Sequence, residues 1–224
     1  MAYWELKTVK MYRIVFLILS SLFFAGCKEN KSIELPYYNE PDFTPLFLKD
    51  KAEIKNKINH TISDFSFLNQ DSILINQTIF ENKIHIANFI FTSCGGICPN
   101  MTRNMKIVND SLSNDKNLVF LSFTVTPWID KPFVLKKYKE LNNIKNKNWE
   151  FLTGPKNEIY KLARQSYFAE EDIGFSKDSS EFLHTEHFLL VDKTKRIRGI
   201  YNGTLTLEMQ QLIEDIKTLE QEEK

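Results

Sequence analysis

The chain has only three cysteines among its 224 residues, and its 29 basic residues are balanced by 29 acidic ones. No block of Lys and Arg interleaves with aromatic residues, so the charge pattern of a nucleic-acid-binding protein is missing. The sequence also lacks a glycine-rich phosphate loop, an ordered Ser-His-Asp set and internal repeats. These absences argue against a nucleic-acid partner, a nucleotide site and serine-type hydrolysis.

A long hydrophobic run is missing as well. The apolar run of residues 14–24 is about half of the roughly 20 residues that span a bilayer, so a transmembrane anchor is the weaker interpretation. It follows Lys7, Lys10 and Arg13 and leads to Ala25-Gly26-Cys27, the pattern of a lipoprotein signal peptide. We therefore expect residues 1–27 to be a signal ending at a lipidated Cys27, which would hold a domain outside the cytoplasm on the membrane. Either Met1 or Met11 can be the start, because the signal is already complete after Met11.

The remaining chain of roughly 200 residues suits one domain with its own core. Residues 28–58 are polar, contain three prolines and show no sustained period, so they predict a tether with an extended contact near Leu35-Pro36-Tyr37-Tyr38. We expect the folded domain over residues 59–224.

Buried strands and crossover helices alternate along this domain. The apolar runs 84–91 and 118–125 predict two buried strands, each followed by a helix, over 98–112 and from Asp130-Lys131-Pro132. An early hairpin, a short strand, another helix, a late hairpin and a last helix are predicted at 65–77, 149–152, from 154, at 187–201 and from 206. This order predicts a thioredoxin-like, three-layer α/β/α sandwich with an N-terminal hairpin extension.

Cys94 and Cys98 lie between the first buried strand and its helix. Residues at i and i+4 near a helix start can present both side chains on one face, and the positive helix terminus favours thiolates. Gly95 and Gly96 let the loop bend. A purely structural disulfide is the alternative, but a disulfide that closes so short a loop stabilises the folded state by only about 2 kcal/mol.

Two thiolates suit Cu(I), and a neutral imidazole can complete a three-coordinate site. On spacing alone, His184 and His187 are both open as that third ligand. Met101 and Met105 have the helical spacing of core residues, His60 and His85 suit surface or capping positions, and Asp130 suits a helix N-cap.

The segment Phe89-Ile90-Phe91-Thr92-Ser93-Cys94-Gly95-Gly96-Ile97-Cys98-Pro99-Asn100-Met101 resembles the C-x-x-x-C-P motif of the Sco/SenC family, copper-binding, thioredoxin-like assembly proteins for cytochrome c oxidase. The resemblance continues through residues 121–132, 149–154 and 184–192. It departs from the family at Gly95, where relatives often have Pro, and at Thr126, where they often have an acidic residue.

The resemblance implies that Cys94, Cys98 and His184 hold copper, as Cu(I) and in addition Cu(II). His187 is then an extra imidazole on the following strand and only the alternative third ligand. It implies a membrane-anchored metallochaperone that serves the CuA centre of an oxidase, with the copper-receiving oxidase subunit and a thiol-disulfide reductant as partners. The alternative is a thiol-disulfide oxidoreductase that uses Cys94 and Cys98 as catalytic residues to reduce the cysteines of a copper-site partner. A thiol peroxidase is a third, less supported interpretation, since the usual Arg or Trp/Gln pattern is missing.

Overall fold

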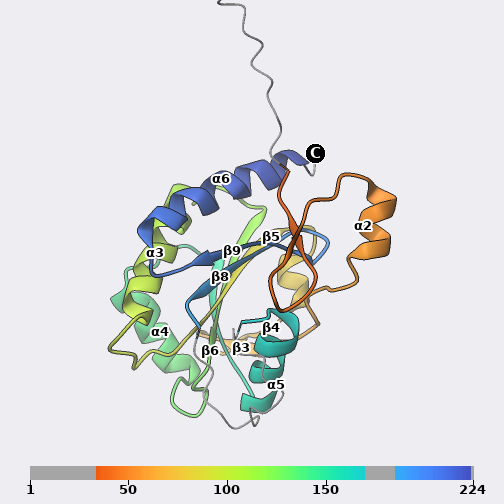
Figure 1. Cartoon of the computed structure of the whole chain (residues 1–224). Coiled ribbons are helices and arrows are strands. Elements are labelled where there is room, and N and C mark those ends of the chain that lie inside the picture. Colours follow the sequence, from red (N-terminus) through yellow and green to blue (C-terminus); the bar gives the residue numbers. More distant parts are fainter. Residues whose placement is uncertain (1–33, 170–184, 223–224) are drawn as a thin grey trace, which may run out of the picture. The chain divides into compact units, whose positions relative to one another are not determined.

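The computed structural model describes residues 34–169 and 185–222, which belong to one compact unit, Glu34–Lys224 (Figure 1). Its strands are β1 (Tyr37–Tyr38), β2 (Pro45–Leu46), β3 (Ser66–Asn69), β4 (Leu74–Asn76), β5 (Ile84–Ile90), β6 (Leu118–Thr124), β7 (Trp149–Thr153), β8 (His187–Val191) and β9 (Ile197–Asn202). The described helices are α2 (Lys51–Lys57), α3 (Cys98–Ser111), α4 (Pro132–Leu141), α5 (Lys156–Lys161) and α6 (Thr206–Glu222), with a 3-10 turn η1 (Gln77–Phe80) and a π-helical turn η2 (Leu162–Ser166).

The strands form one sheet in the order β2-β1-β9-β8-β5-β6-β7-β3-β4, which puts β5 in its centre. Strand β5 pairs in parallel with β6 and antiparallel with β8, and β6 pairs in parallel with β7. Every residue of β5 and β6 is buried, as their apolar runs predict. The early hairpin is β3 and β4, and the late hairpin is β8 and β9.

Side chains that alternate along the central strands supply two cores, one on each face of the sheet. Ile86 and Phe120 lie in the core with residues of α3, α4 and α6. Ala87 and Leu121 lie in the other core, which α5, η1 and η2 close. Figure 1 shows α3, α4 and α6 together on one side of the sheet and α5 on the other. The expected three-layer, thioredoxin-like sandwich is confirmed.

The two ends of the parallel strands lie at opposite edges of the sheet. The parallel strands begin at Ile84, Leu118 and Trp149, and we call this end of the sheet the entry edge. The register places the hairpin turn between β8 and β9 at the same edge, because His85 lies opposite Val191, which lies opposite Ile197. The loop that carries the two cysteines leaves β5 at the opposite edge, as is usual for functional loops of parallel sheets.

The segment expected as a tether is structured from Glu34 on. Leu35 is buried, Tyr38 pairs with Ile197 of β9, and α2 forms within the segment. A buried guanidinium explains why, because Arg198 donates to the carbonyl oxygens of Leu35 (2.8 Å) and Pro36 (3.0 Å). The extended contact is therefore present at residues 35–38, but the chain joins the sheet at Tyr37, ahead of the expected boundary at 59.

Arg198 also ties the end of α6 to this segment. Its Nη2 donates to Glu222 (2.6 Å), whose other carboxylate oxygen accepts from the backbone N–H of Leu35 (2.8 Å). The guanidinium is only 4% exposed and lies over the ring of Tyr37, 4.0 Å from its centre. A buried charge needs such partners, so this contact fixes where the described chain enters the domain.

His85 is not the surface or capping residue that the sequence predicted. It is fully buried in β5, where its ring stacks on Phe80 and its Nε2 lies 3.0 Å from the hydroxyl of Tyr167. Burial lowers the pKa of His85 to about 3, so it is a neutral core residue. His60 is half-buried and its Nε2 lies 2.7 Å from the carbonyl oxygen of Ser166.

Candidate functional site

The cysteine loop joins the end of β5 to the start of α3, and the backbone N–H of Cys94 donates to the carbonyl of Phe91 (3.3 Å). Cys98 is the first residue of α3, and Pro99 follows in the first turn, where its missing N–H costs no hydrogen bond. Both cysteines are free thiols. The expected i, i+4 pair at a helix start is therefore present.

Cys94 is the thiol of the pair whose pKa is lowered. Burial alone would raise its pKa, but hydrogen bonds from the backbone N–H groups of Cys98, Gly96 and Ile97 outweigh this, and the pKa falls below its ordinary value. The backbone N–H of Gly96, for example, lies 3.4 Å from Sγ. These donors at a helix start stabilise the thiolate, which is the nucleophile and the metal ligand.

Cys98 has the opposite character. Burial raises its pKa to about 12, and the neighbouring Cys94 and the Asp130 carboxylate add to the rise. The side chain is 4% exposed and packs with Met101 and Met105 of the same helix, which are fully buried core residues as predicted. At neutral pH Cys98 is therefore a protonated thiol.

Glycine is not sterically required in this loop. A Cβ atom at Gly95 would have no atom within 4 Å, and one at Gly96 would meet only Sγ of Cys94 at 3.8 Å. No described glycine has a positive φ. In the free-thiol state the loop therefore does not use the bend that the two glycines were expected to provide.

A buried carboxylate, Asp130, holds the loop in place. Its side chain is fully buried and accepts from the backbone N–H (3.1 Å) and the hydroxyl (2.6 Å) of Thr92, two residues before Cys94. It also accepts from the hydroxyls of Thr124 (2.6 Å) and Thr126 (2.9 Å). Such charge-assisted hydrogen bonds are strong, so Asp130 fastens the cysteine loop to the end of β6.

This role corrects the sequence-based prediction for Asp130. The N-cap of α4 is Lys131, which makes no side-chain capping bond, so Asp130 caps no helix. Sequence reasoning missed the hydrogen bonds of Asp130 because Thr92 is 38 residues away and becomes its neighbour only through the pairing of β5 with β6. Thr126, where relatives often have an acid, supplies a hydroxyl donor to this carboxylate instead.

His184 and Cys27 lie outside the described residues. The described chain resumes at Thr185, before β8 begins at His187, at the edge of the sheet where the cysteine loop lies. His187 is half-buried, with its ring in edge contact with Phe43 at 5.7 Å. Among residues 34–169 and 185–222, no three His, Cys, Asp or Glu side chains form a metal-binding group. In the same ranges, no helix is long and apolar enough to cross a bilayer.

The unequal thiols lead to a testable difference in alkylation. With iodoacetamide at pH 7.5, we expect Cys94 to react at least about tenfold faster than Cys98, because its pKa is lowered and that of Cys98 is raised. The rate at Cys94 should rise with pH and reach half of its maximum below pH 9, the ordinary pKa of the thiol, because the pKa of Cys94 is lowered. Peptide mass spectrometry of the partly alkylated chain measures both rates, and equal rates would contradict the asymmetry.

A family model described as SCO1/SenC matches residues 54–221. The SCO1 protein homolog of Bacillus subtilis (strain 168) is 31% identical over 168 residues, which are 74% of this chain and 86% of the relative. A SCO1/SenC family lipoprotein from Bacillus anthracis str. Ames has a similar structure, with a TM-score of 0.63 and 28% identity over 73% of this chain and 96% of the other.

Two further solved structures are informative. BsSco, described as a member of the Sco family of cytochrome c oxidase assembly proteins with a disulfide switch, has a TM-score of 0.62 and 30% identity over 73% of this chain and 95% of its own. The copper-bound ScoI of Bradyrhizobium japonicum has a TM-score of 0.56 and 19% identity over 71% of this chain and 99% of its own. At that identity, ScoI supports the shared fold alone.

Proposed function

The chain belongs to the SCO1/SenC family, and from this premise we propose that it is a membrane-anchored copper metallochaperone. Cys94 and Cys98 would bind Cu(I), with His184 as the third ligand, and the chain would deliver the ion to the CuA centre of a respiratory oxidase. Its partner would be the oxidase subunit that receives copper. The observation that carries the proposal is the pair of free thiols four residues apart at the start of α3.

The chemistry of the two thiols supports copper as the cargo. Cu(I) is a soft ion that prefers thiolate ligands, and the lowered pKa of Cys94 makes its thiolate more accessible than that of an ordinary cysteine. Binding at Cys98 would release its proton, because a metal ion draws thiols into the thiolate form. Asp130 would hold the loop during this exchange through its bonds to Thr92. The same three residues, Cys94, Cys98 and His184, would also hold Cu(II).

A lipid at Cys27 would anchor the chain to a membrane with its domain outside the cytoplasm, on the periplasmic side or in the cell envelope. The support is the signal pattern that ends at Cys27, and the description of the similar Bacillus anthracis protein as a lipoprotein. The mass of the N-terminal peptide of the mature chain tests this point separately from copper binding.

The second candidate function is thiol-disulfide exchange, which the asymmetry of the two thiols favours. The Cys94 thiolate would attack one sulfur of a partner disulfide, forming a mixed disulfide and releasing the other sulfur as a thiolate. Cys98 would pass its proton to the partner thiolate released in the first step and attack the sulfur of Cys94, which closes the 94–98 disulfide and frees the second partner sulfur as a thiolate. A separate thiol-disulfide reductant would then return both cysteines to thiols.

Purification without oxygen separates the two functions. For the metallochaperone we expect the reduced chain to take up about one Cu(I) per chain, and His184→Ala to weaken binding by more than about tenfold. For an oxidoreductase alone, Cys94→Ser and Cys98→Ser would abolish disulfide reduction, His184→Ala would spare it, and the purified chain would carry no copper. Metal analysis measures the copper bound per chain, and thiol counting measures the reduction of the partner disulfide.

A further inference from the structure

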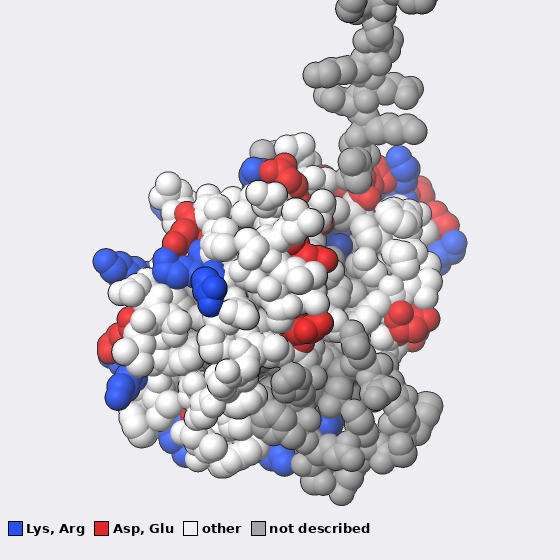
Figure 2. Space-filling model, turned by 60° about the vertical axis from the view of Figure 1, so that its left-hand side comes forward, with Lys and Arg blue, Asp and Glu red and all other residues white. Residues whose placement is uncertain are grey.

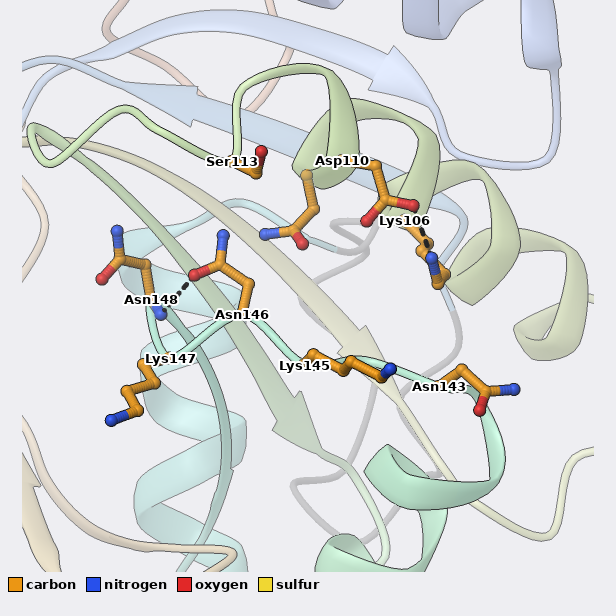
Figure 3. Close-up of a pocket in the computed structure, with 9 residues that line it drawn as sticks. Lys106, Asp110, Ser113, Asn143, Lys145, Asn146, Lys147 and Asn148 are labelled. Carbon is orange, nitrogen blue, oxygen red and sulfur yellow. Dashed lines mark hydrogen bonds and ion pairs between the residues drawn. The ribbon is translucent and has the colours of Figure 1, made fainter.

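A polar surface cavity of about 770 Å³ lies at the entry edge, opposite the edge that carries the cysteine loop. It opens between the end of α3 and the segment 143–148 that joins α4 to β7, as Figure 3 shows. Its lining carries three lysines against one aspartate: Lys106, Lys145, Lys147 and Asp110. The remaining lining residues are Asn109, Asn143, Asn146, Asn148 and Ser113, so the wall has no apolar side chain.

The cavity offers hydrogen-bond donors and net positive charge. Asp110 is already paired with Lys106 of the same helix, which leaves the exposed Lys145 and Lys147 as the cations open to an anion. Figure 2, with the α3 and α4 side of the molecule turned forward, shows basic side chains gathered at the left of the described surface. Ammonium and amide groups together are the donors that proteins use for phosphate.

A buried amide adds an observation that surface charge alone does not explain. Asn109 lines the cavity although it is only 2% exposed. Its Nδ2 is buried and has no hydrogen-bond partner among the described residues. Buried amides are nearly always paired, so this side chain is poised for a group that the protein itself does not provide. The two neighbouring asparagines are satisfied locally, since Asn146 accepts from the backbone N–H of Asn148 (2.9 Å) and Asn148 donates to the carbonyl of Asp115 (3.1 Å).

The cavity lies at the same edge of the sheet as the point where the chain enters the domain. Asn148 accepts from the backbone N–H of Phe120, near the start of β6, and Asn117 accepts from that of Ile84, the first residue of β5. Leu35 and the Arg198 contact are at this edge too, through the pairing of Tyr38 with Ile197. Seven residue steps separate Cys27 from Glu34, a reach of about 25 Å at most.

We propose that this cavity binds the phosphate-bearing headgroup of an anionic phospholipid in the membrane that holds the chain. The inference rests on the lipid anchor at Cys27 in the proposed function and is independent of copper. The cavity is larger than a phosphate requires and lies in the size range of small-molecule sites, which leaves room for a headgroup polyol. Binding there would turn the entry edge to the bilayer and point the cysteine loop away from it.

Lysine footprinting of the mature, lipid-anchored chain tests this proposal. The chain is reconstituted in vesicles of phosphatidylcholine alone or with phosphatidylglycerol, and reductive methylation of each lysine is followed by mass spectrometry. We expect phosphatidylglycerol to slow the methylation of Lys145 and Lys147 by about fivefold. Lys131, at the opposite edge of the sheet beside Asp130, is the control: its ammonium donates to the carbonyl of Pro127 (2.9 Å), and its methylation rate should be the same in both kinds of vesicle.

Two variants distinguish a built site from general attraction of lysines to an anionic surface. Asn109→Leu should remove most of the protection of Lys145 and Lys147, and Lys147→Gln should reduce that of Lys145 even if the first variant folds poorly. Unchanged protection in both variants would overturn the proposal, as would equal protection of Lys131.

Inorganic phosphate added to phosphatidylcholine vesicles identifies the source of the phosphate group. Protection by millimolar phosphate but not by phosphatidylglycerol would overturn the lipid assignment. An N-terminal peptide without lipid would show separately that the anchor is wrong. A chain that does not bind copper, with unchanged lysine protection, would show that only the copper proposal is wrong.

Discussion

Replacing Cys94 by serine is expected to lower the Cu(I) affinity of the reduced chain by more than about 100-fold, the upper end of what loss of a residue around a metal ligand costs. The serine hydroxyl is a poor ligand for a soft ion and does not ionise at neutral pH, whereas the Cys94 thiol has a lowered pKa. Cys98→Ser should have a comparable effect, because it likewise leaves Cu(I) with only one thiolate ligand. Competition with a chromogenic Cu(I) chelator under anaerobic conditions measures the affinities.

Met101→Leu is the matched control for both cysteine variants. Met101 lies one turn after Cys98, is fully buried and offers another soft sulfur atom. Because it is a core residue, the leucine variant should keep the affinity within about twofold and cost less than about 1.5 kcal/mol of stability. A large loss of affinity in Met101→Leu, or none in Cys94→Ser, would rule out the two-thiol site.

Replacing Asp130 by alanine is expected to lower the free energy of unfolding by about 3 kcal/mol. The substitution leaves the backbone N–H of Thr92 and the hydroxyls of Thr124 and Thr126 without their acceptor in a buried environment. Asp130→Asn keeps one carbonyl oxygen as an acceptor, so its free energy of unfolding should fall by about half as much as that of Asp130→Ala. Urea unfolding followed by circular dichroism measures both losses.

Asp110→Ala is the control for this prediction. Asp110 is also an aspartate with a partner, but it is exposed and pairs with Lys106 one turn away, so its loss should cost less than about 0.5 kcal/mol. The loop should also respond to the Asp130 variants, because Thr92 precedes Cys94 by two residues: the difference in alkylation rate between Cys94 and Cys98 should shrink in Asp130→Ala. An unchanged unfolding midpoint would show that Asp130 does not fasten the loop.

The sequence predicts the frame of this domain well and its long-range polar contacts poorly. Strands β5 and β6 are evident from their apolar runs, and α3 from its first proline and the spacing of its methionines, because these signals are local. The position of Cys94 and Cys98 follows from the same local order. The fold and the position of the thiol pair can therefore be predicted from the sequence alone.

Three buried polar residues show where sequence reasoning fails. Asp130 looks like a helix cap because its partners Thr92 and Thr124 meet it only in the folded sheet. His85 looks exposed because polar residues usually are, yet Phe80 and Tyr167 enclose its ring. Arg198 gives no local sign that it draws Leu35 and Pro36 onto the sheet, and so the segment before residue 59 was expected to be a tether.

X-ray absorption spectroscopy of the Cu(I)-loaded chain, compared with His184→Ala, tests the proposed function most directly. The two-cysteine, one-histidine site predicts two sulfur ligands and one nitrogen ligand in the parent, with the nitrogen lost and both sulfurs kept in His184→Ala. His187→Ala is the matched control and should leave the spectrum unchanged. A copper ion that keeps its nitrogen ligand in His184→Ala, or that has fewer than two sulfur ligands in the parent, would contradict the proposed site.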